Sequence, residues 1–300
     1  MRIIAIAACF VLAACAARPE PAAVLFDDFA YDSTAALAAN GWILRTAPGW
    51  PGVPGATWGP ESFSLAEDPS DAGDRVLRMT SSTDGTPANT RQTQICHERK
   101  YFEGTYAARV RFTDAPESGP DGDQIVETFY LISPLRAPMD LDYSETDFEY
   151  LPNGGWGREG PILFATTWET FHPEPEWKAD NDSGTLQGSF AGWRTLVLQI
   201  GEGRVRYFVD GRLLADHGDR VYPEVPMSLN FNLWFIRDGL LPAGPVRRWV
   251  EDIDWVYHRA NAILSASEVE REVGELRAGE VRFVDSVPAR EPRLASPCDF

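Results

Sequence analysis

The chain has 300 residues, a formal net charge of −18, four histidines and four cysteines. Its length suffices for one large β domain or two ordinary domains. A surface this acidic repels nucleic acid, anionic lipid and heavily sulfated polysaccharides, although the same charge would also serve solubility alone. No CxxC pair and no His/Cys cluster with metal-ligand spacing is present, which argues against a metal site such as zinc.

The N-terminus has the order of a secretion signal. A short positive start precedes the apolar run Ile3–Leu12, and the small residues that follow end at Cys15. The apolar run is too short to cross a bilayer as a stable helix. Cys15 stands where bacterial lipoprotein signals place the lipidated cysteine, with an ordinary cleaved signal as the alternative. We expect residues 1–14 to be removed, residues 15–23 to form a lipidated anchor and linker, and the protein to be exported to the bacterial cell envelope, at the outer membrane or cell surface.

From Val24 onward the composition is typical of an all-β protein. Short runs rich in β-branched and aromatic residues alternate with Gly, Pro, Asp and Asn. The expected strands are Arg75–Thr80, Gly104–Phe112, Gln124–Leu131, Glu145–Leu151, Ile162–Thr167, Arg194–Gln199, Val205–Val209, Ser228–Leu233 and Val250–His258. Many strands at this spacing, without alternating helices, indicate a sandwich or barrel rather than a parallel sheet.

One strand pair is predicted as a hairpin by its turn. Asp210-Gly211 lies inside the run from Arg204 to Leu214. This dipeptide suits a type I′ turn, whose positive φ angles match the twist of the flanking strands. The run therefore predicts two antiparallel neighbours joined by a tight turn.

One helix is predicted near the C-terminus. Ser265 and Glu268 form a capping box, and apolar residues from Val269 to Leu276 fall on one face. We expect one β domain over residues 24–262, with residues 263–300 forming this helix and an extended tail packed on its exterior.

The most informative segment is the predicted strand that begins at Glu145. Side chains two residues apart in a strand share a face, so Glu145, Asp147 and Glu149 project together. Three like charges in a row repel one another, and a fold that keeps them usually uses them. The three carboxyls should titrate as a coupled set that retains one proton near neutral pH.

Retaining glycoside hydrolysis needs two such carboxyls, one to attack the anomeric carbon and one to protonate the departing oxygen. Those groups are about 5–5.5 Å apart in retaining enzymes. The Cα atoms of Glu145 and Glu149 would be about 13–14 Å apart in an extended strand. Side chains that lean together on a curved strand could close most of that difference, so the spacing permits the retaining geometry without proving it.

The segment Glu145-Thr-Asp-Phe-Glu149 resembles the signature of glycoside hydrolase family 16, the laminarinase, lichenase and agarase group. The resemblance extends to Tyr101–Phe112 before it, to the Arg204–Leu214 hairpin and to Trp249–Tyr257 after it, and covers roughly Phe26 to His258. It implies a concanavalin A-like fold, a two-sheet antiparallel β-jelly-roll sandwich.

The same resemblance implies a function. Glu145 matches the family's nucleophile, Asp147 its assisting carboxylate and Glu149 its acid/base. The chain would then be a retaining, endo-acting glycosidase of β-linked neutral polysaccharide, such as β-glucan, with no cofactor. Calcium, held by backbone carbonyls in some relatives, leaves no readable signature. We expect a monomer whose partner is the polysaccharide, with membrane contact through the lipid anchor alone.

Three alternatives stay open. The acidic strand face could be merely solvated, or the protein could bind carbohydrate at the cell surface without catalysis. A transglycosylase would use the same site and pass the sugar to another sugar. The family commonly has a tryptophan-bearing segment before the catalytic strand, where this chain reads Glu127–Ile132, so the specific sugar and linkage also stay open.

Candidate sugar-binding residues follow from side-chain chemistry, because aromatic faces stack on pyranose rings and polar groups bond hydroxyls. Those nearest the catalytic strand or on later strands are Trp156, Trp168, His172, Asn230, Asn232 and Trp234. Packing in the core or in loops would explain each of them equally well.

Two cysteines remain in the expected mature domain, Cys96 and Cys298. In an oxidising compartment they would form one disulfide between the tail and the body.

Overall fold

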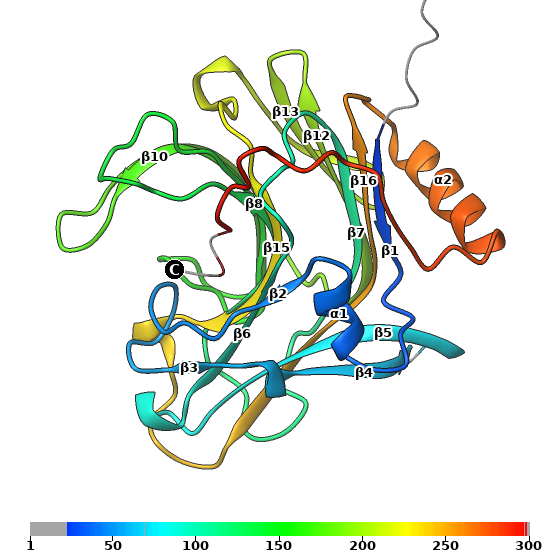
Figure 1. Cartoon of the computed structure of the whole chain (residues 1–300). Helices are drawn as coiled ribbons and strands as arrows, with labels where there is room; N and C mark the ends of the chain where they lie inside the picture. The colour runs from blue at the N-terminus through cyan, green and yellow to red at the C-terminus, as the bar shows by residue number, and fades with distance from the viewer. Residues whose placement is uncertain (1–22, 69, 297, 299–300) are drawn as a thin grey trace, which may run out of the picture.

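The computed structural model describes residues 23–68, 70–296 and 298 (Figure 1). The predicted secretion signal and the lipidation of Cys15 lie outside these residues. Within them, no helix has both the length and the apolar character that crossing a membrane would need.

The described strands form two facing layers, which Figure 1 shows side by side. Sheet A contains β1 (Val24–Asp27), β4 (Phe63–Asp68), β5 (Asp71–Thr83), β7 (Gly104–Phe112), β12 (Gly192–Gly201), β13 (Arg204–Val209), β14 (Arg212–His217), β16 (Arg247–Ala260) and β17 (Phe283–Asp285). Sheet B contains β2 (Ile43–Leu44), β6 (Arg91–Cys96), β8 (Ile125–Ile132), β9 (Glu145–Leu151), β10 (Ile162–His172), β11 (Lys178–Gln187) and β15 (Ser228–Phe235).

Sheet B has the strand order β2-β6-β15-β8-β9-β10-β11, and all of these pairs are antiparallel. In sheet A, β16 pairs with β7 on one side and with β5 and β1 on the other. Strand β3 (Thr57–Trp58) runs parallel to the start of β6, and α1 (Ala35–Ala39) is a short helix after β1. Short 3-10 helices lie at Pro60–Ser62, Pro87–Asn89, Asp219–Val221 and Arg237–Gly239.

The two facing antiparallel sheets confirm the predicted jelly-roll sandwich.

The core lies between the sheets because every second side chain of each strand turns inward. In sheet B, Phe148 of β9, Phe129 of β8 and Phe231 of β15 are buried and stack in sequence. Their ring centroids are 6.3 Å apart for Phe129–Phe148 and 5.1 Å for Phe129–Phe231. Because Phe148 faces the core, the side chains of Asp147 and Glu149 project from the opposite face of sheet B.

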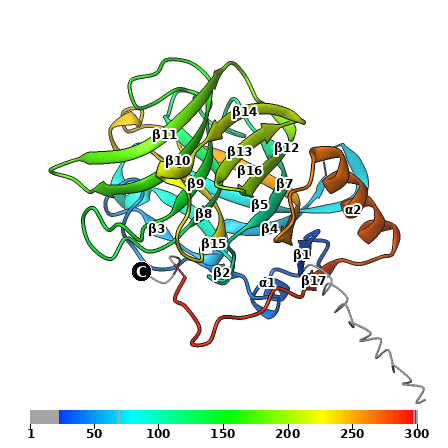
Figure 2. The same ribbon diagram turned by 90° about the horizontal axis from the view of Figure 1, so that it is seen from above.

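The C-terminal helix α2 (Ala266–Ala278) forms with the predicted capping box and packs on the outer side of sheet A (Figure 2). Val269 and Val273 form one buried hydrophobic cluster there with Phe26, Val197 and Tyr257. The following segment differs from the predicted tail, because residues 283–285 pair with β1 as strand β17. The hairpin turn has the expected positive φ angles, 48° at Asp210 and 73° at Gly211.

The end of the described chain is joined to sheet B. A disulfide links Cys96, the last residue of β6, to Cys298, and their Cα atoms are 5.8 Å apart. Both cysteines are buried. Two contacts hold the chain along this path, a salt bridge from Lys100 to Asp285 and a hydrogen bond from Ser296 to the carbonyl oxygen of His97.

Candidate active site

The three acidic residues of β9 lie at the middle of sheet B. Strand β9 pairs with β8 and β10, so Asp147 stands directly between Tyr130 and Thr166 in the sheet. The side chains of Glu145, Asp147 and Glu149 all line a cleft of about 990 Å³. Neighbouring strands and loops supply the remaining walls. The alternation predicted from the sequence therefore puts three carboxyls on one wall of a single cleft.

Removal from water is the largest influence on these carboxyls, because it penalises their charged forms. It raises the pKa of Glu145 to about 7 and the pKa of Glu149 to about 8, the latter also through the charge of Glu145. The pKa of Asp147 lies well above its ordinary value, through burial and then the charges of Glu145 and Glu149. The two glutamates are thus poised to exchange protons near neutral pH.

Hydrogen bonds separate the roles of the two glutamates. The Tyr143 hydroxyl donates to Oε2 of Glu145, and Asp147 also hydrogen-bonds Glu145. Asp147 in turn accepts a 2.7 Å hydrogen bond from Nε1 of Trp168. No hydrogen bond to the Glu149 side chain is formed among the described residues. Donors stabilise a carboxylate, so Glu145 is the better anion and Glu149 the better proton carrier.

Aromatic side chains gather at both ends of the acidic row. Trp156 and Trp234 lie at the Glu149 end of the row, and their ring centroids are 6.3 Å apart. The ring centroid of Trp50 is also 6.3 Å from that of Trp234. Beyond Glu145, at the opposite end, a second group contains Trp168, Phe171 and Trp177, with centroid separations of 5.9, 6.1 and 5.7 Å. A sugar chain lying in the cleft would meet stacking surfaces on both sides of the carboxyls.

Four of the six predicted sugar-binding residues line the cleft, namely Trp156, Trp168, Asn232 and Trp234. Trp168 also donates a hydrogen bond to Asp147, a contact that the spacing of residues along a strand could not predict. Asn232 is held by a 2.6 Å hydrogen bond from the Thr128 hydroxyl.

The other two predictions need correction. Asn230 is fully buried, and its amide donates to the carbonyl oxygen of Ser228 at 2.9 Å, so it does not line the cleft. His172 is displaced because β10 contains a bulge between Trp168 and Thr170, which changes the alternation of the residues that follow. Its ring bonds the carbonyl oxygen of Pro173 and lies 3.6 Å from Glu176.

Sequence reasoning missed several residues of the cleft. Tyr143, Trp177 and Arg45 all line it. Tyr143 carries one signal that could have identified it, because it precedes Glu145 by two residues and so belongs on the same face. The others come from loops or short elements far from β9 in the sequence, where no local pattern marks them.

Two arginines line the cleft, and their partners differ. Arg45 is buried and donates to Gln94 and to the carbonyl oxygens of Ala47 and Trp50, at 2.7–2.9 Å. Arg136 forms salt bridges with Asp140 and Asp142. Arg136 is therefore charge-compensated, whereas Arg45 bonds only neutral oxygens and forms no salt bridge among the described residues.

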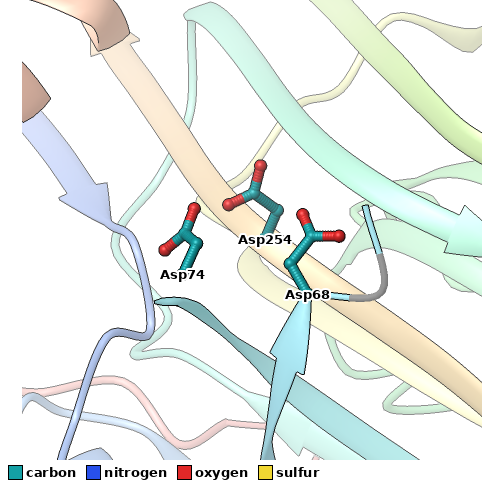
Figure 3. A group of neighbouring side chains, drawn as sticks. All are labelled: Asp68, Asp74 and Asp254. Carbon is teal, nitrogen blue, oxygen red and sulfur yellow. The ribbon is translucent and has the colours of Figure 1, made fainter. Parts of the chain in front are cut away.

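A separate acidic group lies on the other sheet. Asp68, Asp74 and Asp254 each place one oxygen within 4.8 Å of the others (Figure 3). Two guanidinium groups already bind it: Arg277 contacts Asp74 and Asp254, and Arg109 contacts Asp254. Because these arginines supply the compensating charge, the group does not fit a calcium ion as it stands.

No protein-family model matches the sequence, and no curated protein matches it. Solved structures with a similar fold include the Bacillus licheniformis β-glucanase, with a TM-score of 0.58 and 14% sequence identity over 81% of this chain and 100% of that chain. Another similar structure is a Bacteroides ovatus mixed-linkage-glucan enzyme of glycoside hydrolase family 16, bound to its G4G4G3G product. Its TM-score is 0.57 and its sequence identity is 16%, over 77% of this chain and 98% of that chain.

The κ-carrageenase from Pseudoalteromonas carrageenovora, in complex with an oligotetrasaccharide, has a TM-score of 0.54. Its sequence identity is 13%, over 82% of this chain and 98% of that chain. All three neighbours match along nearly their entire length. The chain therefore has the jelly-roll fold of glycoside hydrolase family 16, as the sequence resemblance predicted.

Proposed function

We propose that this protein is a retaining, endo-acting glycoside hydrolase of a β-linked neutral polysaccharide. The observation that carries the proposal is the row Glu145, Asp147 and Glu149 on one wall of an open cleft, with unequal hydrogen bonding of the two glutamates. Neighbours with this fold are named as a β-glucanase, a κ-carrageenase and a mixed-linkage-glucan enzyme, which supports glycosidase activity.

In the first step, an oxygen of Glu145 bonds the anomeric carbon while the glycosidic C–O bond breaks. The electron pair of that bond stays on the departing oxygen, which takes the proton of Glu149. In the second step, water attacks the anomeric carbon and Glu149 accepts its proton. As the new C–O bond forms, the bond to Glu145 breaks and its electron pair stays on Glu145, so both groups return to their starting states.

Two features of the cleft support the finer parts of the proposal. Aromatic groups on both sides of the carboxyls suit a polymer that extends past the cleavage point in both directions, as endo cleavage requires. The acidic row on the cleft wall and the pairing of Arg136 with Asp140 and Asp142 favour a neutral sugar over an anionic one.

The test is release of reducing ends from a panel of polysaccharides. The panel contains β-1,3-, mixed-linkage and β-1,4-glucans, xyloglucan, galactan and agarose, with κ-carrageenan as the anionic member. Wild type should act on a neutral polymer, while Glu145→Gln and Glu149→Gln should each lose turnover and keep a melting temperature close to wild type. Activity that survives in both variants would contradict the assignment. Binding without any product would favour a carbohydrate-binding protein, and products longer than the donor would identify a transglycosylase.

A further inference from the structure

The contact between Tyr143 and Glu145 lies outside the acidic motif. Tyr143 stands at the end of the loop between β8 and β9, two residues before Glu145, and only 2% of its surface is exposed. Its hydroxyl donates to Oε2 of Glu145, and both side chains line the cleft. We propose that Tyr143 is a positioning residue that holds one oxygen of the nucleophile, Oε2, in a fixed place. This inference rests on the proposed function.

The Tyr143 ring has little freedom to move. Phe171 of β10 contacts it edge-on, with ring centroids 5.3 Å apart. The neighbouring backbone is clamped by two hydrogen bonds between Ser133 and Ser144, at 2.8 and 2.9 Å. A hydroxyl on a fixed ring determines where its partner lies, so Glu145 is held in one rotamer without the entropy cost of ordering it during the reaction.

Tyr143 is also a permanent donor. Burial, and then the charge of Glu145, raise the pKa of Tyr143 well above its ordinary value, so the phenol keeps its proton throughout the working range. The other titratable groups near Glu145 are Asp147 and Glu149 on its own strand, Tyr130 on β8 and Tyr207 on β13.

The two other phenols are engaged elsewhere. The Tyr130 hydroxyl accepts from Gln94 at 2.8 Å, and the Tyr207 hydroxyl donates to the carbonyl oxygen of Thr166 at 2.7 Å. Among the described residues, Tyr143 is therefore the phenol that bonds Glu145.

A fixed donor on the nucleophile acts in both steps. Before attack, it favours the ionised form of Glu145 and so lowers the pKa of that carboxyl. In the second step, negative charge returns to Glu145 as its bond to the sugar breaks, and the same donor stabilises that charge. Removing the hydroxyl should raise the pKa of Glu145 and slow release of the sugar more than its capture.

The experiment compares Tyr143→Phe with Tyr150→Phe. Tyr150 lies on β9, the strand of Glu145, and its buried hydroxyl also donates to a carboxylate, that of Asp114, so it is a matched control. The acidic limb of the kcat/KM profile should move upward by about one pH unit in Tyr143→Phe and stay in place in Tyr150→Phe. In Tyr143→Phe, kcat should fall more than kcat/KM. Identical profiles for the two variants and wild type would overturn the proposal.

A titration that does not depend on turnover separates this inference from the proposed function. Infrared difference spectra follow the carboxyl C=O band against pH in wild type, Tyr143→Phe, Tyr150→Phe and Glu145→Gln. A band that is absent from Glu145→Gln and titrates higher only in Tyr143→Phe supports the proposal. A band that titrates alike in both tyrosine variants overturns it. If wild type cleaves no polysaccharide, the proposed function fails, while these spectra still decide whether Tyr143 controls ionisation of Glu145.

Discussion

The indole nitrogen of Trp168 donates a 2.7 Å hydrogen bond to Oδ2 of Asp147, which joins β10 to the central carboxyl of β9. The register places Trp168 opposite Glu145, so its side chain reaches diagonally to the neighbouring acid. This bond fixes Asp147 between the two glutamates and partly offsets the burial that raises its pKa. Trp168 thus acts on the carboxyls themselves as well as on the surface of the cleft.

Replacing Trp168 with Phe should lower kcat/KM by roughly 2- to 10-fold, because a hydrogen bond to a neutral acceptor contributes about 0.5–1.5 kcal/mol. Steady-state kinetics on the polysaccharide identified by the panel would measure this. Trp177→Phe is the control, since Trp177 belongs to the same aromatic group and its half-exposed indole forms no hydrogen bond with the described residues. That variant should change mainly KM. Equal losses of kcat in both variants would contradict a role for the Trp168 bond.

The activity should depend on pH as a bell centred between about 7 and 8. The nucleophile must be ionised, and burial raises the pKa of Glu145 to about 7, so activity falls as the solution becomes more acidic. The acid must be protonated, and burial with the charge of Glu145 raises the pKa of Glu149 to about 8, so activity falls again at higher pH. Measurement of kcat/KM from pH 5 to 10 checks this. A maximum near pH 5 would be inconsistent with carboxyls in a water-poor cleft.

A buried acid pair should make stability depend on pH. Glu251 of β16 is fully buried, and burial, then the charge of Glu127, hold its pKa well above the ordinary range. A group with a raised folded pKa contributes stability that is complete below its unfolded pKa, about 4.3, and is lost as pH rises toward the folded value. The loss is up to about 1.4 kcal/mol per pH unit.

Glu251→Gln should therefore be more stable than wild type at pH 8, with the difference shrinking toward pH 4. Urea unfolding at several pH values would measure it. Glu67→Gln, a change of an exposed side chain on β4, is the control and should leave the pH slope as in wild type. A Glu251→Gln curve parallel to wild type would show that Glu251 does not cause the slope.

The disulfide should account for a sizeable part of the stability. Cys96 and Cys298 are separated by 202 residues, so the bond restricts most of the unfolded chain. Replacing both with Ser should reduce the free energy of unfolding by about 2–5 kcal/mol. Denaturant titration with and without reductant would measure this, and reductant should not affect the double variant. An unchanged midpoint for reduced wild type would argue against the contribution.

We propose that Cys15 carries a lipid that holds the protein at the cell envelope, on the basis of the signal-like segment that precedes it. Cys15→Ser should move the protein from the membrane fraction to the soluble fraction. Fractionation followed by immunoblotting would measure this, with Cys298→Ser as the control that should stay with the membrane. A Cys15→Ser protein that stays in the membrane fraction would disprove lipid anchoring through this residue.

Local patterns determined what can be read from short segments. The alternation in Glu145–Leu151 placed three carboxyls on one strand face, because side chains in a strand repeat every two residues. The Asp210-Gly211 turn and the Ser265–Glu268 capping box were equally readable, since each depends on backbone preferences within a few residues. These signals predicted the fold class and the acidic residues at the centre of the cleft.

Contacts between distant segments decided the rest. Strand β11, from Lys178 to Gln187, is so polar that no sequence pattern marks it, and it forms because β10 supplies a partner edge. The bulge after Trp168 turned His172 away from the cleft, and loop closure brought Trp50 and Trp177 into it. Such placements depend on packing energies summed over the assembled sheets, so only the tertiary structure could specify which side chains surround Glu145.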